Sequence, residues 1–165
     1  MAYLTAPELL ARFGAEEIAQ VADRGTPRDV SAALLELAVS GDELVGWAES
    51  DVSAVTAAVA RIQTCLDDAE SAIDGYLSSR YATPLAVVPL LVKRLTADVT
   101  RYYLHADSAS DPVIKAYEQA MGLCRDIAQG KISFGADVIN SPKTNGEAVE
   151  MVSGTRLWSR EARGL

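Results

Sequence analysis

Apolar residues recur along residues 51–76 in alternating steps of four and three, the period of a helix with one buried face. Asp51 is the candidate N-cap, and the pattern extends over about seven helical turns. The opposite face is polar, so one side should lie in the core and the other in solvent. The apolar seam consists of Val55, Val59, Ile62, Leu66, Ala69, Ile73 and Tyr76, and the polar face of Arg61, Gln63, Asp67, Asp68, Glu70 and Asp74.

Start and stop signals predict two short helices near the N-terminus. Thr5 and Glu8 have the spacing of a capping box, in which the two residues satisfy each other's backbone amides, so a helix over about 6–13 is expected. The segment 15–24 opens with two acids, which suit the positive end of a helix, and Gly25 should end it.

Residues 26–50 carry weaker signals. Pro27 or Asp29 should start a third helix through VSAALLELAV, and Gly41 should end it. Trp47 follows in an ambiguous stretch. Because a lone Trp near helical Leu and Val usually packs inside, we expect Trp47 in the core.

Two further helices are predicted after the long one. The first follows Pro89 through LLVKRLTADVTRYYLHAD, and the second follows Ser-Asp-Pro, where Asp111 should cap and Pro112 should take the first helical position. Gly130 should end the second helix. Their apolar stripes are Leu91, Leu95, Val99 and Tyr102 in the first, and Val113, Tyr117, Ala120 or Met121, Cys124 and Ile127 in the second.

The segment IDGYLSSRYATPL, residues 73–85, is predicted to form the corner between the two longest helices. Gly75 lies inside a helix, where glycine costs about 1 kcal/mol relative to alanine. Close approach of another helix or chain would explain it, since a missing side chain permits such contact. Tyr76 should continue the buried seam, with Leu77 at its edge.

The second half of this corner contains the helix end and the turn. Arg80 and Tyr81 should lie where the helix exposes its last carbonyls, which favour a nearby cation. Pro84 disfavours helix at the residue before it and should turn the chain. These roles are structural and require no substrate.

Helical period is lost from Lys131 onward, and the stretch EAVEMVSGTRLW has only imperfect alternation. We therefore predict an all-α protein of about five to six helices. A single helical domain should occupy 1–130, with the long central helix packed on the two following helices. An extended C-terminal tail of weak strand character should occupy 131–165.

Composition is that of an ordinary globular protein, with 49% hydrophobic and 23% charged residues in 165. The net charge of −8 argues against a protein that wraps nucleic acid through phosphate contacts. No apolar run reaches the roughly 18 residues of a membrane span, and the N-terminus lacks the pattern of a secretory signal. Cys65 and Cys124 should be buried free thiols of a protein made in the cytoplasm.

The sequence shows no recognisable reaction chemistry. His105, the one histidine, has the position of a surface or helix-terminal residue, and no phosphate-binding glycine motif or nucleophile elbow occurs. We predict no catalytic residue, no metal ligand and no cofactor, and hence no enzyme.

A metal-dependent nuclease using the carboxylates of residues 67–74 is the weakest alternative, because acids at that spacing usually form a solvated helix face. A small acidic helical DNA-associated regulator is the other alternative, with Lys93, Arg94 and Arg101 as its only candidate recognition residues.

Three blocks resemble the Mu-like prophage neck protein family, and more widely the α-helical head–tail connector, or adaptor, proteins of phages. The blocks are LTAPELLARFGAEEIAQVADR, IDGYLSSRYATPL and VKRLTADVTRYYLH, and the ending SGTRLWSREARGL is also similar. The resemblance covers about residues 3–24, 64–130 and 150–165, whereas 26–60 looks longer than the family's connection there. The family motif carries onto Asp74, Gly75, Tyr76, Arg80, Tyr81, Pro84 and Leu85 at the corner, which should pack against other subunits. At the tail it carries onto Arg156, Trp158, Ser159 and Arg160, which together with Leu157 form the predicted partner-binding segment.

The resemblance implies a non-enzymatic virion protein at the capsid–tail junction, made in the bacterial host cytoplasm. Such adaptors form a ring, commonly of twelve copies, under the portal protein, and they extend the DNA channel and receive the next neck or tail-completion protein. DNA should pass without specific binding, since an acidic wall repels phosphates. Residues 156–165 sum to +2 on an otherwise acidic chain, which suits an arm that docks on a partner.

Overall fold

A computed structural model describes residues 2–134 of the chain, and the predicted all-α class is confirmed there. Six α-helices and one 3₁₀ turn occur in this part of the chain, and no strand is found in it. The elements are α1 (Ala6–Phe13), α2 (Ala15–Ala22), α3 (Ala32–Ser40), α4 (Glu49–Leu77), α5 (Leu90–His105), η1 (Ala106–Ser108) and α6 (Asp111–Ala128).

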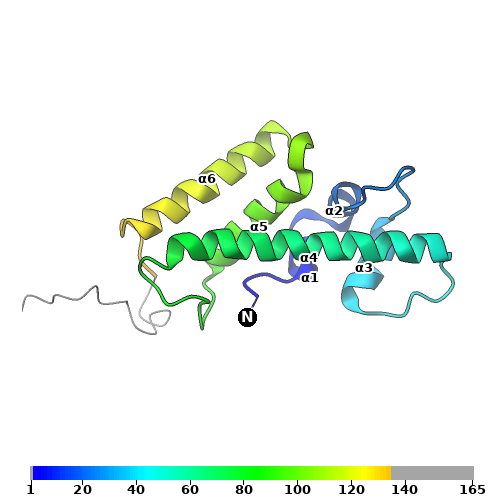
Figure 1. Ribbon diagram of the computed structural model, residues 1–165, viewed down its shortest axis with the longest axis horizontal. Coiled ribbons are helices and arrows are strands. Elements are labelled where there is room, and N and C mark those ends of the chain that lie inside the picture. The colour runs from blue at the N-terminus through cyan, green and yellow to red at the C-terminus, as the bar shows by residue number, and fades with distance from the viewer. Residues whose placement is uncertain (1, 135–165) are drawn as a thin grey trace, which may run out of the picture.

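The long helix α4 runs the length of the molecule, and the other helices pack along it (Figure 1). As predicted, α5 and α6 both contact α4 and also contact each other. The helices α1, α2 and α3 gather along the N-terminal half of α4. No helix within residues 2–134 combines the length and the apolar character needed to cross a membrane.

The core divides into two clusters that share α4 and α5. The first contains side chains of α1, α2, α3 and the N-terminal half of α4, and the second contains side chains of α6 and the C-terminal half of α4. Tyr103 on α5 packs against both clusters. The ring of Tyr102 stacks on that of Tyr117 with centroids 4.1 Å apart, which joins α5 to α6.

The seam of α4 is confirmed with two local shifts. Val55, Ile62, Leu66, Ala69 and Ile73 are buried as predicted. Val59 and Tyr76 are only half-buried, and Ala58 and Leu77 occupy the buried positions beside them. The prediction that Leu77 lies at the edge of the seam is therefore wrong. A helix with 3.6 residues per turn drifts away from a strict four–three alternation, so its buried stripe shifts at the ends.

Three predicted helix starts are displaced by one to five residues. α4 begins at Glu49 after Ala48, so Asp51 lies in its first turn, where an acid still favours the positive helix end. In α6, Ser110 is the N-cap and Asp111 already belongs to the helix. α3 begins at Ala32 rather than near Pro27.

The late start of α3 has a physical cause in Asp23. Its carboxylate is buried and accepts the backbone N–H groups of Gly25 at 2.7 Å, Asp29 at 2.8 Å and Val30 at 3.0 Å. Burial alone would raise the pKa of Asp23, but these three donors outweigh it, and the pKa lies below its ordinary value. The loop is thus held in a non-helical shape until Ser31 caps α3 by accepting the N–H of Leu34.

The capping box of α1 is present, since the Glu8 carboxylate accepts the Thr5 backbone N–H at 2.9 Å. The prediction for Trp47 is wrong, because this residue lies in the loop between α3 and α4 and is 37% exposed. A lone Trp gave the expectation of a core position, but Trp47 packs in neither core cluster, whereas Leu44 of the same loop packs against the first.

Candidate functional site at the end of the long helix

The predicted corner after α4 is organised by Tyr3, which the sequence analysis did not single out. The Tyr3 hydroxyl donates to the Asp74 carboxylate and accepts the Leu85 backbone N–H at 2.9 Å. Burial and the bond to Asp74 both raise the pKa of Tyr3, so the hydroxyl keeps its proton. The N-terminal segment thereby ties the end of α4 to the chain that leads into α5.

Tyr81 forms the second link of the corner. Its ring is buried and lies 4.9 Å from the ring of Phe134, and its hydroxyl accepts the Phe134 backbone N–H at 3.1 Å. The Tyr81 N–H also donates to the carbonyl of Leu77 at 2.9 Å, which places Tyr81 at the helix end as predicted. Phe134, shortly after α6, is thus fixed to the end of α4.

Arg80 also follows the last turn of α4, but its guanidinium lies at the end of a different helix. Gly130, after α6, has φ +79°, and a Cβ built on it would lie 1.6 Å from Nη1 of Arg80. The side chain therefore occupies the space that a larger residue at 130 would need. A cation is favourable near the C-terminal end of a helix, here that of α6.

Gly75 does not provide the close approach that we expected within the chain. A Cβ built on Gly75 has no heavy atom within 4 Å, and the residue is exposed. Since Gly75 points away from both core clusters, helix packing within residues 2–134 does not explain it. A contact at Gly75 would have to involve something other than the described residues.

The remaining corner residues differ in burial. Leu85 is buried in the second core cluster, and Tyr76 is half-buried against the same cluster. Pro84 is exposed and follows a cis peptide bond, at the turn where the sequence predicted a change of direction. Tyr3 thus links Asp74 to Leu85, and Tyr81 is linked separately to Phe134. Gly75 and Pro84 face solvent.

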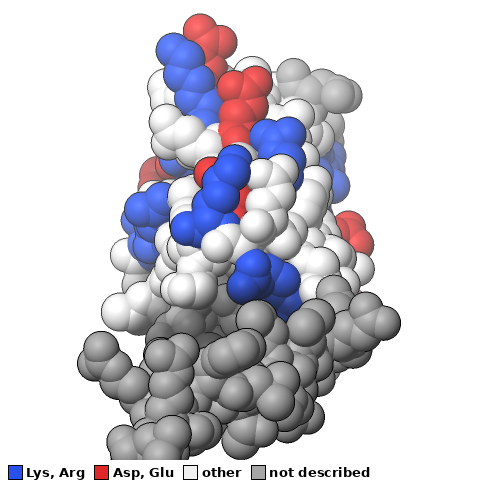
Figure 2. All heavy atoms as spheres, turned by 90° about the vertical axis from the view of Figure 1, so that its left-hand side faces the viewer, with Lys and Arg blue, Asp and Glu red and all other residues white. Residues whose placement is uncertain are grey.

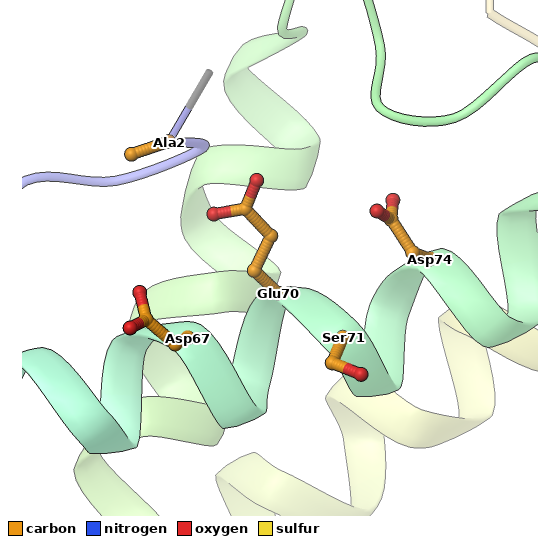
Figure 3. A pocket seen from close by; sticks show the side chains of 5 residues that line it. All are labelled: Ala2, Asp67, Glu70, Ser71 and Asp74. Carbon is orange, nitrogen blue, oxygen red and sulfur yellow. The ribbon is translucent and has the colours of Figure 1, made fainter.

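Acidic side chains of α4 line a shallow pocket beside this corner (Figure 3). The pocket is lined by Ala2, Asp67, Glu70, Ser71 and Asp74. Glu70 accepts the Tyr3 backbone N–H at 3.2 Å, and Asp67 accepts a side-chain N–H of Gln63 at 2.8 Å. Glu70 and Asp74, which accepts the Tyr3 hydroxyl, therefore hold the N-terminal segment in place. In the part of the chain that the structure describes, no three His, Cys, Asp or Glu side chains are grouped so as to hold a metal ion.

The candidate DNA-contacting cations of α5 are engaged by acids of the same chain. Lys93 pairs with Glu8 at 2.6 Å, and Arg101 forms two bonds with Glu17 at 2.6 and 2.9 Å. Arg94 lies 3.9 Å from Asp98. A recognition helix presents such side chains to phosphates and bases, so this arrangement does not support the DNA-binding alternative.

His105 is the last residue of α5, as its predicted helix-terminal position requires. Its Nε2 lies 3.1 Å from the Glu17 carboxylate, which Arg101 also binds. Burial alone would raise the pKa of Glu17, but the bonds from Arg101 and His105 lower it below its ordinary value. This cluster ties α2 to α5 and forms part of the packing between the helices.

The tail residues Arg156, Leu157, Trp158, Ser159 and Arg160 lie outside the described residues, as does the predicted strand character. Residues 131–134 are described, and Phe134 is buried against Tyr81. The domain boundary at 130 stays a prediction.

Comparison with known proteins gives one family and two relatives. Residues 3–153 match the family model described as Bacteriophage Mu, Gp36. The chain is 32% identical over 101 residues to the Mu-like prophage FluMu protein gp36 of Haemophilus influenzae, which covers 61% of this chain and 72% of that protein. It is 30% identical over 104 residues to Gene product J of Escherichia phage Mu, which covers 62% of this chain and 74% of the relative.

Proposed function

The chain belongs to the bacteriophage Mu Gp36 family, and on this basis we propose that it is a non-enzymatic head–tail connector of the virion. Family membership indicates a phage protein with a structural or assembly role. The connector role is the finer proposal, and the family match across most of the chain is the observation that carries it.

In the proposed assembly, about twelve copies form a ring beneath the portal protein at the capsid–tail junction. A ring requires heterologous contacts, in which one patch of a subunit meets a different patch of its neighbour. The helical body supports this, because the cross-links from Tyr3 and Tyr81 fix the corner after α4 and give each subunit a defined shape. The corner residues are thus proposed to set how neighbouring subunits pack.

The proposed ring extends the DNA channel and receives the next neck or tail-completion protein. The net charge of −8 supports passage of DNA without specific binding. Acidic side chains repel phosphates and so cannot make the contacts whose release of counterions favours binding to DNA. Residues 156–160 are proposed as the segment that docks on the portal protein or on another partner. Their two arginines and one tryptophan are residue types enriched at binding hot spots.

Electron microscopy of the neck of a virion that carries this chain tests the proposal. We expect density into which the α4 corner fits, in a ring between portal and tail. A nonsense mutation in the gene should yield DNA-filled heads and free tails that do not join, and supplying the intact chain should restore joining. Particles that join normally without the chain, or a complete neck that contains no density for it, would refute the connector role.

A further inference from the structure

The exposed large hydrophobic side chains of residues 2–134 lie at the two opposite ends of α4. Val45 and Trp47, which are 81% and 37% exposed, lie in the loop that enters α4. Val87 and Leu90, which are 52% and 84% exposed, lie between α4 and the first turn of α5. In Figure 1 these two segments are seen at the right and left ends of the long helix.

The stretches of sequence that form these two ends differ in charge. Residues 29–60 contain six acids and no Lys or Arg, whereas residues 75–97 contain three Lys or Arg and no acid. Figure 2 views the end where α4 finishes, and Lys and Arg are more prominent than Asp and Glu on this face. We call Val45, Trp47 and the surrounding acids Asp42, Glu43, Glu49 and Asp51 the acidic end, and Val87, Leu90, Arg80, Lys93 and Arg94 the basic end.

Charged side chains at both ends are available to form ion pairs with another molecule. Within the described residues, no acid of the acidic end lies within 4.0 Å of a Lys, Arg or His nitrogen, and Arg80 of the basic end lies within 4.0 Å of no Asp or Glu oxygen. Arg94 has only the long contact of 3.9 Å with Asp98, whereas Lys93 is paired with Glu8. A helix of 29 residues separates the two ends by about 43 Å, so one copy cannot bring its own ends together.

We propose that the acidic end of one copy binds the basic end of the next copy of this chain. The inference rests on the proposed ring and names the surfaces that form it. Opposite charges steer the two ends together, while Trp47 supplies an aromatic anchor against the exposed Val87 and Leu90. Contacts between two like ends place like charges together, so the contact is head-to-tail, as a closed ring requires.

Charge reversal in the full-length chain tests this contact. One variant carries Asp42→Lys, Glu43→Lys and Glu49→Lys, which changes the charge of the four acids of the acidic end from −4 to +2, and a second carries Arg80→Glu and Arg94→Glu at the basic end. A matched control carries Asp67→Lys, Asp68→Lys and Glu118→Lys, three exposed acids outside both ends. Circular dichroism establishes that each variant is folded, and sedimentation velocity at low and high salt measures assembly.

We expect the wild-type chain to form oligomers that dissociate as salt rises, and the control to behave in the same way. Each reversed variant should associate about tenfold or more weakly, because both of its ends then carry like charge. An equimolar mixture of the two reversed variants should assemble again, since each acidic end regains a basic partner. A Trp47→Ser variant, which leaves the charges intact, should also weaken assembly.

The outcomes separate this contact from the connector role. A wild-type chain that stays monomeric at all concentrations, reversed variants that assemble like the control, or a mixture that does not assemble would each overturn the contact. If the reversed variants still form a neck ring in the virion, the contact is wrong and the connector role stands. If the reversed variants lose assembly and their mixture regains it, but virions lack the chain, the contact stands and the connector role is wrong.

Discussion

At the scale of single residues, Asp23 shows how one buried carboxylate can decide where a helix begins. The sequence near Pro27 and Asp29 carries local start signals, yet Asp23 binds the amides of Asp29 and Val30 and keeps them out of a helix. Local propensity is a weak preference that a buried, multiply bonded group overrides. The position of Asp23 on the buried side of the loop could not be derived from the local pattern.

Replacement of Asp23 by alanine should destabilise the protein. We expect Asp23→Ala to lower the free energy of unfolding by about 1–3 kcal/mol, because buried backbone N–H groups lose their acceptor. Urea unfolding at neutral pH measures the loss. Asp29→Ala in the same loop is the control, since the side chain of Asp29 is exposed and should matter little.

The lowered pKa of Asp23 also fixes the sign of a pH effect. The stabilisation by its carboxylate should be complete above the unfolded-state pKa of about 3.9 and should be lost as pH falls through the lower folded-state pKa. The difference in stability between wild type and Asp23→Ala should therefore shrink in acid. A difference that grows as pH falls would contradict the assigned role.

At the scale of elements, the sequence predicted the helices well and their mutual attachments poorly. Periodicity and caps are local, so α1, α4, α5 and α6 were found with small shifts at their ends. The bonds of Tyr3 join residues 71 and 82 positions apart, and no local pattern in the chain indicates them. The corner was identified by its resemblance to a family and by Pro84, whereas its fastening by Tyr3 and Phe134 required the structure.

Removal of the Tyr3 hydroxyl should loosen the corner. We expect Tyr3→Phe to cost about 1–3 kcal/mol of unfolding free energy, because the buried Leu85 amide loses its acceptor and the ring itself is retained. Tyr76→Phe is the matched control, since its ring is half-buried in the same region. Equal stabilities of the two variants in urea unfolding would show that the hydroxyl does not fasten the corner.

Gly75 and Gly130 should respond oppositely to alanine. Gly75→Ala should stabilise α4 by up to about 1 kcal/mol, because a Cβ there meets nothing and alanine favours a helix. Gly130→Ala should destabilise, since its φ is +79° and the Arg80 side chain lies where the Cβ would be. Thermal unfolding of both variants checks the signs. A destabilised Gly75→Ala would mean that helix propensity does not govern this site.

At the scale of the whole molecule, composition predicted a globular protein with a net negative charge, but it did not predict how the charge is distributed. The run without Lys or Arg (residues 29–60) and the run without Asp or Glu (residues 75–97) can be counted in the sequence. That they lie at opposite ends of the molecule follows only from the length of α4, which separates them. Trp47 illustrates the same limit. Its hydrophobicity suggested the core, and only the fold shows that it lies at an exposed end of the long helix.

The two cysteines make this chain a convenient background for site-specific labelling. Both are free and buried, and burial raises the pKa of the Cys65 thiol and raises that of Cys124 to about 11. At pH 7, only roughly one Cys124 thiol in ten thousand is then ionised, and the thiolate is the form that reacts with maleimides. A cysteine introduced at Ser50 or Ser79, both exposed, would take up a fluorophore in preference to the native pair, without first removing them. Energy transfer between dyes at these two positions on neighbouring copies would then report their spacing.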